Sequence, residues 1–180
     1  MTSVVFNRQV VQPRKVVCVG KNYAAHIEEM ASVPAENMVV FMKPATSIGN
    51  ELFAELDEPL HYESEICLLM QRGRVAGVGF GLDLTKRETQ AKLKAAGLPW
   101  ERSKAFTGSA IFSEFVTAPD TLTQLGVELR VDDVLRQKGD VSLMLYPPEA
   151  MLAELRHFLV LEDFDIVMTG TPAGVGAVRV

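Results

Sequence analysis

The sequence predicts an α+β fold in which short strands are interrupted irregularly by a few helices. Apolar runs of strand length, bounded by glycine or proline, recur along the chain and are typical of buried strands. Predicted helices do not alternate regularly with these strands, which argues against a fold built from successive βαβ units. The chain has 180 residues, of which 48% are hydrophobic and 23% charged, and no repeat or linker divides it. We therefore expect one domain over residues 1–180.

The first predicted elements are two buried strands with a helix between them. Residues 15–19 form an apolar run that ends at a glycine and reads as a buried strand. Asn22 is placed to cap a short helix over residues 24–31. A second buried strand is expected over residues 38–42, and Pro44 should stop it.

The next two strands carry acidic residues. Glu63 and Glu65 enter an apolar run that continues to residue 70. Residues 77–84 alternate, with three glycines and Asp83 on one face and apolar residues on the other. Glycine in a strand often marks the close approach of a ligand or of another backbone. The spacing is not that of a dinucleotide-binding loop.

The remaining elements follow from turn and capping signals. Residues 85–88 have the spacing of a capping box that begins at Thr85, and they open a helix through Ala96. Residues 127–137 read as a hairpin around Asp132 and Asp133. Residues 166–168 form the last predicted buried strand. A helix should begin at the two prolines 147 and 148, with an apolar stripe of Met151, Leu152, Leu155, Phe158 and Leu159.

Composition excludes several classes of function. A net charge of −5 with no basic stripe argues against nucleic-acid binding. No apolar run approaches the roughly 18 residues of a membrane helix, and the N-terminus lacks signal-peptide features. Cys18 and Cys67 lie in apolar runs and form no metal or redox pair. We therefore expect a cytoplasmic protein with no nucleic-acid and no membrane partner.

Three carboxylates form a candidate metal site. Because side chains alternate along a strand, Glu63 and Glu65 share one face, and Asp83 closes the next strand. A carboxylate removed from water needs a cation or a metal beside it. Three hard oxygen ligands suit Mg2+ or Mn2+. Two solvated glutamates at a strand end are the alternative.

His26 and Glu29 form a candidate base. They are three residues apart and hence neighbours on a helix surface, where the carboxylate would orient the imidazole and raise its basicity. An exposed helical ion pair is the alternative. Lys43 and Lys104 are isolated cations next to apolar residues, and each could bind substrate oxygens or remain solvated.

Seven short motifs occur in a fixed order along the chain. They are GKNYAAH (20–26), FMKP (41–44), HYESE (61–65), LDLT (82–85), GLPW (97–100), KAF (104–106) and TGTP (169–172). Together they resemble the fumarylacetoacetate hydrolase family, in particular its small single-domain acylpyruvate hydrolases and oxaloacetate decarboxylases. The resemblance runs from about Val16 to Gly176.

This resemblance implies a fold, a metal site and a set of catalytic residues. The fold would be a β-rich roll of mixed sheets, and family members are commonly homodimers. Mg2+ or Mn2+ would be held by Glu63, Glu65 and Asp83, with His26 and Glu29 as the catalytic dyad and Lys104 close to the ion. The positions that correspond to substrate contacts are Arg87, Gln90 and Thr171, and Lys43 is a further candidate for substrate binding.

The expected activity is hydrolysis of a C–C bond in an acylpyruvate or related β-diketo acid, through a metal-stabilised enolate. His26 would deprotonate the attacking water, and Lys104 would stabilise the developing negative charge. Decarboxylation or tautomerisation of oxaloacetate, or isomerisation of another 2-oxo acid, is the alternative on the same site. An inactive relative that only binds such acids is the non-enzyme alternative.

Three departures from the family pattern bear on the domain. The connection over residues 70–77 is short, and the chain ends at Val180, soon after the TGTP motif. We therefore expect that part of this connection and a C-terminal strand segment are missing, either as deletions or as mobile loops. A hairpin position that often carries Asn-Gly reads Asp132-Asp133, which is a smaller change.

Overall fold

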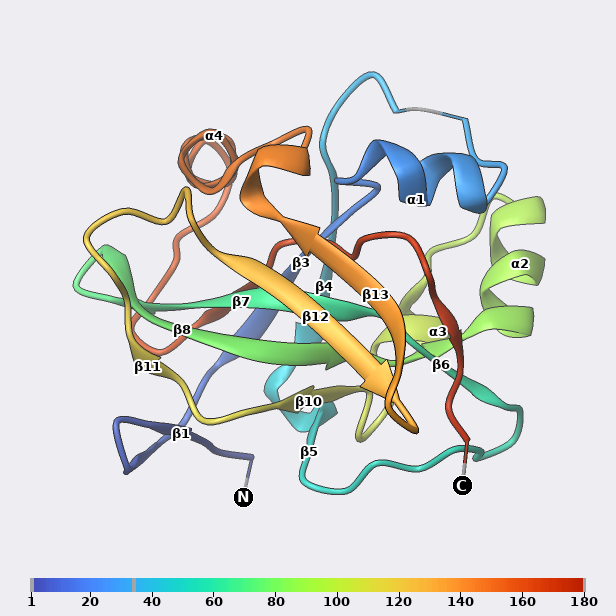
Figure 1. Cartoon of the computed structure of the whole chain (residues 1–180), viewed down its shortest axis with the longest axis horizontal. Helices are drawn as coiled ribbons and strands as arrows, with labels where there is room; N and C mark the ends of the chain where they lie inside the picture. The colour runs from blue at the N-terminus through green and yellow to red at the C-terminus, as the bar shows by residue number, and fades with distance from the viewer. Residues whose placement is uncertain (1, 34, 180) are drawn as a thin grey trace.

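The computed structural model describes residues 2–33 and 35–179, so the chain end at Val180 lies outside the described residues. Its main sheet has eight strands in the order β4-β3-β14-β7-β8-β10-β5, with β11 paired to β8 (Figure 1). The strands are β3 (Lys15–Gly20), β4 (Val39–Pro44), β5 (Ile48–Gly49), β7 (Ser64–Gln71), β8 (Arg74–Asp83), β10 (Ala110–Phe112), β11 (Val116–Thr117) and β14 (Ile166–Met168). β14 runs parallel to β3 and β10 parallel to β5, whereas the other pairs are antiparallel. This mixed sheet confirms the predicted α+β class and the β-rich roll.

Smaller sheets and peripheral helices complete the fold. The paired strands are β1 (Val4–Phe6) with β2 (Gln9–Val11), β12 (Gly126–Val131) with β13 (Val134–Asp140), and β15 (Gly176–Ala177), β6 (Leu60–Tyr62) and β9 (Thr85–Lys86) in one sheet. The helices are α1 (Ala24–Glu29), α2 (Arg87–Ala95), α3 (Glu101–Lys104) and α4 (Pro148–Arg156), with the short turns η1 (Ala45–Ser47) and η2 (Val141–Leu143). None of the helices in the described part of the chain is long and apolar enough to cross a membrane.

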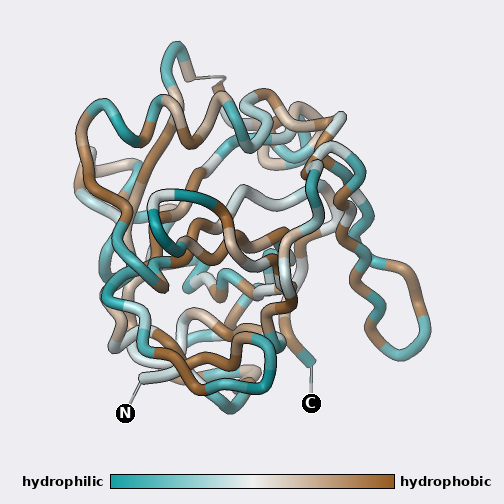
Figure 2. Tube along the Cα trace, turned by 90° about the vertical axis from the view of Figure 1, so that its left-hand side faces the viewer, coloured by the Kyte–Doolittle hydropathy of each residue, from teal (hydrophilic) through white to brown (hydrophobic). Residues whose placement is uncertain are grey.

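The core lies on both faces of β7. Ile66, Leu68 and Met70 pack in one hydrophobic cluster, which includes residues of α4, and Cys67 and Leu69 pack in the opposite cluster. A strand buried on both faces reads as a continuous apolar run, which explains why this element was found in the sequence. Figure 2 shows such hydrophobic stretches distributed along the chain between hydrophilic turns.

The glycines of β8 make room for aromatic side chains. A Cβ atom at Gly79 would lie 3.0 Å from the Phe115 ring, and one at Gly77 would lie 3.0 Å from the Phe6 ring. The third glycine of the series, Gly81, faces the Phe112 ring and the Cys67 sulfur. The expectation of a close backbone approach is confirmed only at Gly77, where the Val116 carbonyl oxygen would lie 3.3 Å from the added Cβ; otherwise side chains, mostly aromatic, fill the space.

Two predicted helix caps are wrong because tertiary partners replace them. Asn22 does not cap α1; its amide donates to the Thr169 carbonyl at 2.8 Å, and its carbonyl oxygen accepts from the Tyr146 N–H at 2.7 Å. Thr85 lies in β9 rather than at the start of α2. The first N–H groups of α2 donate instead to the carboxylate of Glu58, which satisfies donors that the capping box would have served.

Other expectations are confirmed or adjusted in detail. The β12–β13 hairpin turns at Asp132 and Asp133, both with positive φ, as a two-residue turn requires. β4, predicted as a buried strand that Pro44 stops, is instead a partly buried edge strand that includes Pro44. Proline is tolerated at an edge because no further strand needs its N–H. Phe158 lies beyond the end of α4 and is 61% exposed, so it does not belong to the buried stripe.

The short connection over residues 70–77 is part of a continuous hairpin between β7 and β8. Arg72 and Gly73, with φ values of 52° and 71°, form its two-residue turn, and Gln71 pairs directly with Arg74. The hairpin therefore closes without an inserted segment and holds the far ends of β7 and β8 side by side. At that far end the chain places its acidic residues.

Candidate active site

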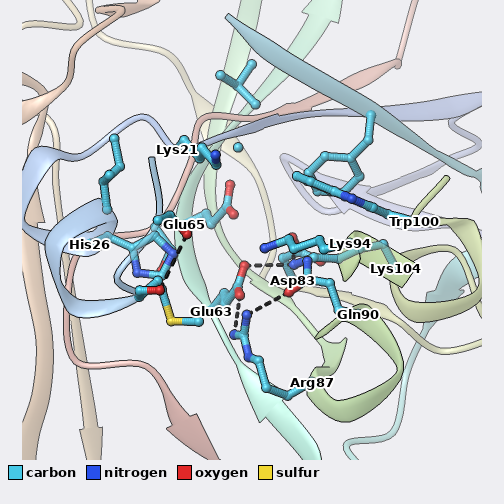
Figure 3. A pocket seen from close by; sticks show the side chains of 17 residues that line it. Lys21, His26, Glu63, Glu65, Asp83, Arg87, Gln90, Lys94, Trp100 and Lys104 are labelled. Carbon is cyan, nitrogen blue, oxygen red and sulfur yellow. Dashed lines mark hydrogen bonds and ion pairs between the residues drawn. The ribbon is translucent and has the colours of Figure 1, made fainter. Parts of the chain in front are cut away.

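Glu63, Glu65 and Asp83 meet at one end of the β7–β8 hairpin (Figure 3). Glu65 pairs with Gly81 in the ladder, and the Asp83 N–H donates to the Glu63 carbonyl at 2.8 Å. One carboxylate oxygen from each residue lies within 4.8 Å of the others, and the residues are only 6%, 2% and 1% exposed. The alternative of two solvated glutamates is therefore wrong.

Glu63 is surrounded by cations. The Lys104 ammonium lies 2.8 Å from Glu63 Oε2 and 2.7 Å from Asp83 Oδ2, and it donates to Thr85 Oγ1 at 2.6 Å. Arg87 contacts the other Glu63 oxygen at 2.5 Å. Burial acts to raise the pKa of Glu63, but the charges of Lys104 and Arg87 outweigh it and hold that pKa well below its usual range. The pKa of Lys104 is raised because Asp83 and Glu63 outweigh the opposing effect of burial.

Lys43 forms a buried ion pair with Asp83. Its ammonium is fully buried, lies 2.8 Å from Asp83 Oδ1, and donates to the Lys104 carbonyl and to the carbonyl and hydroxyl of Ser109. All three of its N–H donors have partners within the protein. Lys43 does not line the pocket, so in this structure it positions Asp83 and Lys104 rather than facing a substrate.

Glu65 has no cation of its own among the described residues. Its Oε2 accepts one hydrogen bond, from the Gly170 N–H at 2.7 Å. Burial, followed by the negative charge of Asp83, raises the pKa of Glu65 well above its usual range. Each carboxylate oxygen can accept more than one bond, so the cations beside Glu63 and Asp83 leave lone pairs free. Three buried hard oxygens, one of them uncompensated, fit a divalent metal ion.

His26 and Glu29 form a pair on α1, at the edge of the same pocket. His26 Nδ1 lies 3.3 Å from Glu29 Oε2, and the histidine is only 9% exposed. The Gly174 N–H donates to both oxygens of Glu29, at 3.0 and 3.1 Å. Because Nδ1 faces the carboxylate, Nε2 remains for contact with a substrate or water. The histidine of this pair is therefore buried, whereas Glu29 remains exposed and is held by the Gly174 N–H.

The loop over residues 169–174 supports both halves of the site. Its Gly170 N–H binds Glu65, and its Gly174 N–H binds Glu29. The Thr171 hydroxyl between them donates to the Ser64 carbonyl at 2.9 Å. This loop therefore fixes the distance between the carboxylate cluster and the histidine pair.

Gln137 anchors that loop and was missed in the sequence. Its amide donates to Thr171 Oγ1 at 2.8 Å and to the Pro172 carbonyl at 2.7 Å, and its oxygen accepts from the Ser64 N–H at 2.9 Å. It is 1% exposed although it lies in a mainly exposed hairpin strand. The only sequence signal for its inward orientation is its position two residues before Gly139, which places both on the same face of the strand.

The pocket brings together most of the predicted site residues. Those that line it are His26, Glu63, Glu65, Asp83, Arg87, Gln90, Lys104 and Thr171. Gln90 accepts a hydrogen bond from Arg87 at 2.9 Å, which holds both side chains on one face of α2. Lys21, Lys94 and Trp100 also line the pocket and were not singled out in the sequence.

Comparison with known proteins agrees with this geometry. The family model of the fumarylacetoacetate hydrolase C-terminal domain matches residues 15–179. The chain is 37% identical to the oxaloacetate tautomerase YcgM of Escherichia coli, over 92% of this chain and 84% of that protein.

Solved structures show the same fold. A fumarylacetoacetate isomerase/hydrolase homologue from Oleispira antarctica matches with a TM-score of 0.92 and 34% identity, covering 100% of this chain and 90% of that one. The fumarylpyruvate hydrolase of Pseudomonas aeruginosa, solved in complex with Mn2+ and pyruvate, matches with a TM-score of 0.88 and 31% identity, covering 98% and 86%. The chain therefore belongs to the fumarylacetoacetate hydrolase family.

Proposed function

We propose that this protein is a divalent-metal-dependent hydrolase that cleaves a C–C bond in an acylpyruvate or a related β-diketo acid. The observation that carries this proposal is the single pocket lined by the three carboxylates and by His26. A metal site and a supported base that share one small cavity can act on the same bound molecule.

Glu63, Glu65 and Asp83 would hold the ion, which we propose to be Mg2+ or Mn2+. Oxygen-only donors favour these ions over softer metals. The Pseudomonas aeruginosa relative in complex with Mn2+ and pyruvate supports both the metal and a 2-oxo acid as ligand. When bound, such an ion would polarise a 2-oxo group and favour the enolate of pyruvate as leaving group.

The side chains of the pocket account for the remaining steps. His26, oriented by Glu29, would take a proton from water through Nε2. The water oxygen would then bond to the distal carbonyl carbon, and the C–C bond would break with its electron pair going to the pyruvate enolate. The proton held by His26 would pass to the enolate carbon, so the products are pyruvate and a carboxylic acid. Lys104 would stabilise the negative charge that develops next to the carboxylates. Arg87, Gln90 and Thr171 would contact the substrate from α2 and from the loop over residues 169–174.

Oxaloacetate tautomerisation or decarboxylation is the second candidate function. Tautomerisation is favoured by relatives named oxaloacetate tautomerase in Escherichia coli and Bos taurus, each 37% identical to this chain. The same pocket would bind the 2-oxo acid end of oxaloacetate, and no water would have to be activated for loss of CO2.

Two measurements test these functions. Acylpyruvate cleavage and oxaloacetate turnover are assayed with Mg2+, with Mn2+ and with a chelator, and equal rates in all conditions would eliminate the mechanism. In a His26→Ala variant, hydrolysis should collapse, whereas decarboxylation should survive; loss of both together would refute that division of roles. Absence of any turnover at saturating metal would favour a binding protein.

We also propose that the protein forms a homodimer, as family members commonly do. Sedimentation of the purified chain tests this directly, and a monomer at micromolar concentration would exclude it.

A further inference from the structure

Four cationic side chains, Lys21, Arg87, Lys94 and Lys104, line the pocket together with its three carboxylates, and Lys43 adds a further positive charge behind Asp83. Three cations, Lys43, Lys104 and Arg87, contact Glu63 and Asp83. None of these three cations forms an ion pair with Glu65, which therefore remains available to bind the metal. Two further lysines, Lys21 and Lys94, line the same pocket and have no ion-pairing carboxylate within the described part of the chain.

Lys94 lies on the pocket face of α2, one turn after Gln90. Part of its side chain is exposed, but its ammonium lies 4.9 Å from the centre of the Trp100 ring. This cation–π contact is worth about 0.5–1 kcal/mol at an exposed site. A carboxylate that offered charge-assisted hydrogen bonds would therefore compete well for the same ammonium.

Lys21 follows β3 and lines the pocket from another wall (Figure 3). Its ammonium donates to the Val33 carbonyl at 2.8 Å and has two further N–H donors. The cations of the pocket also influence each other: the pKa of Lys94 is lowered by burial and then by the charge of Arg87, Glu63 opposes this shift, and Lys104 and Lys21 lower the pKa further. An anion placed among them would relieve this repulsion.

We propose that Lys94 and Lys21 form a second anion subsite, which binds the distal carboxylate of the substrate. On this view the enzyme selects longer dicarboxylic 2-oxo acids, such as fumarylpyruvate, over monocarboxylic acids such as acetylpyruvate. The inference rests on the proposed function, since it takes the 2-oxo acid end of the substrate to lie at the carboxylate cluster. It adds the residues that bind the opposite end of the substrate.

Kinetics with matched variants test the subsite. Lys94→Gln removes the charge from the pocket, and Lys92→Gln removes the same charge from an exposed position of the same helix. We expect Lys94→Gln to raise KM for fumarylpyruvate about tenfold or more, as loss of a charge-assisted hydrogen bond implies. Its kcat/KM for acetylpyruvate should change less than about twofold, and Lys92→Gln should change neither substrate. Lys21→Gln should repeat the pattern of Lys94→Gln with a smaller effect.

Fluorescence gives a readout that does not depend on catalysis. Trp100 is the single tryptophan of the chain, and Lys94 lies over its ring. A ligand that draws the ammonium away should therefore change the emission of Trp100. We expect such a change with 2-oxoglutarate and little change with 2-oxopentanoate, which has the same carbon number and no distal carboxylate. Lys94→Gln should abolish the response to 2-oxoglutarate.

The outcomes separate this inference from the proposed function. If the wild type turns over no substrate but Trp100 responds only to the dicarboxylic acid through Lys94, the hydrolase proposal fails and the subsite stands. If Lys94→Gln impairs fumarylpyruvate and acetylpyruvate equally, or behaves as Lys92→Gln does, the subsite is refuted. An equal fluorescence response to both acids would refute it as well.

Discussion

Two buried carboxylates, one in β7 and one directly before the neighbouring strand β14, have their negative charges compensated in different ways. Asp165 directly precedes β14 and is 0% exposed, and Glu65 lies in the neighbouring strand β7 and is 2% exposed. Asp165 has its own cation, the Lys15 ammonium at 2.5 Å, and accepts from the Glu162 N–H at 2.8 Å. Glu65 has one backbone N–H and no cation among the described residues.

This difference indicates which buried carboxylate belongs to a functional site. A buried carboxylate with a dedicated cation has its charge compensated within the fold, even though Asp165 Oδ1 itself accepts no hydrogen bond from the described residues. A buried carboxylate without one raises the free energy of the empty protein, and a bound cation lowers it. Perturbed groups of this kind concentrate at functional sites. By this criterion Glu65 marks a metal site and Asp165 a structural ion pair.

The largest expected effect is that of Glu65→Gln on activity. Losing one of three metal ligands should lower kcat/KM at least about a thousandfold, whereas the variant should fold as well as the wild type because no buried charge is left unpaired. Steady-state kinetics and metal titration by calorimetry measure both. Near-normal activity with unchanged metal affinity would remove Glu65 from the metal site.

Asp165→Asn should show the reverse pattern: lower stability with nearly unchanged activity. Replacing the buried partner of Lys15 should lower the free energy of unfolding by about 1–3 kcal/mol, since the ammonium is partly exposed and can turn to water or to Glu162. Activity at a temperature well below unfolding should stay within about twofold. Urea unfolding and kinetics on the same preparation test this prediction, and a catalytic loss larger than the stability loss would contradict it.

The pH dependence of the metal-free protein should report Glu65. Because its pKa is raised in the folded state, the folded protein binds more protons than the unfolded chain above the ordinary value near 4.5. Stability of the chelated protein should therefore fall as pH rises through the raised pKa, by up to about 1.4 kcal/mol per pH unit. Glu63 acts oppositely: its contribution is present above pH 4.5 and is lost below it.

Glu65→Gln serves as the control for this measurement. Other groups titrate in the same range, among them His61, whose pKa is lowered by burial and by Arg87. The difference between wild-type and Glu65→Gln unfolding curves isolates the glutamate. Added metal should release protons and remove the difference in slope; parallel curves without metal would show that Glu65 is ionised in the empty site.

The smallest effect is expected at the surface, close to Asp165. Arg14 contacts Glu162 at 2.9 Å, but their side chains are 72% and 43% exposed. Arg14→Ala should change the free energy of unfolding by no more than about 0.5 kcal/mol, since water and salt screen such pairs. A loss as large as that of Asp165→Asn would mean that ionic contact, rather than burial, decides the energy.

Much of the site could be predicted from the sequence because its key positions follow local rules. Alternation placed Glu63 and Glu65 on one face, and helical spacing placed Glu29 beside His26. Local rules failed where a distant segment supplied the partner. Asn22 stands at the position of a helix cap in the sequence, yet its amide donates to the Thr169 carbonyl. The N–H groups at the start of α2 donate to Glu58 rather than to Thr85. Lys43 was expected either to bind substrate oxygens or to remain solvated, and it is instead fully buried against Asp83.

What the chain encodes locally is the set of strands, their buried faces and the order of the carboxylates along them, because the side-chain period of two is a property of neighbouring residues. Which cation reaches which carboxylate was decided only by folding. Lys104 meets Glu63 across 41 positions, and Lys15 meets Asp165 across 150. Electrostatic compensation depends on distances of a few ångströms in space and leaves no periodic trace in sequence. For that reason only the three-dimensional structure revealed that Glu65, Lys21 and Lys94 have no ion-pair partner among the described residues, and that Gln137 anchors the loop over residues 169–174.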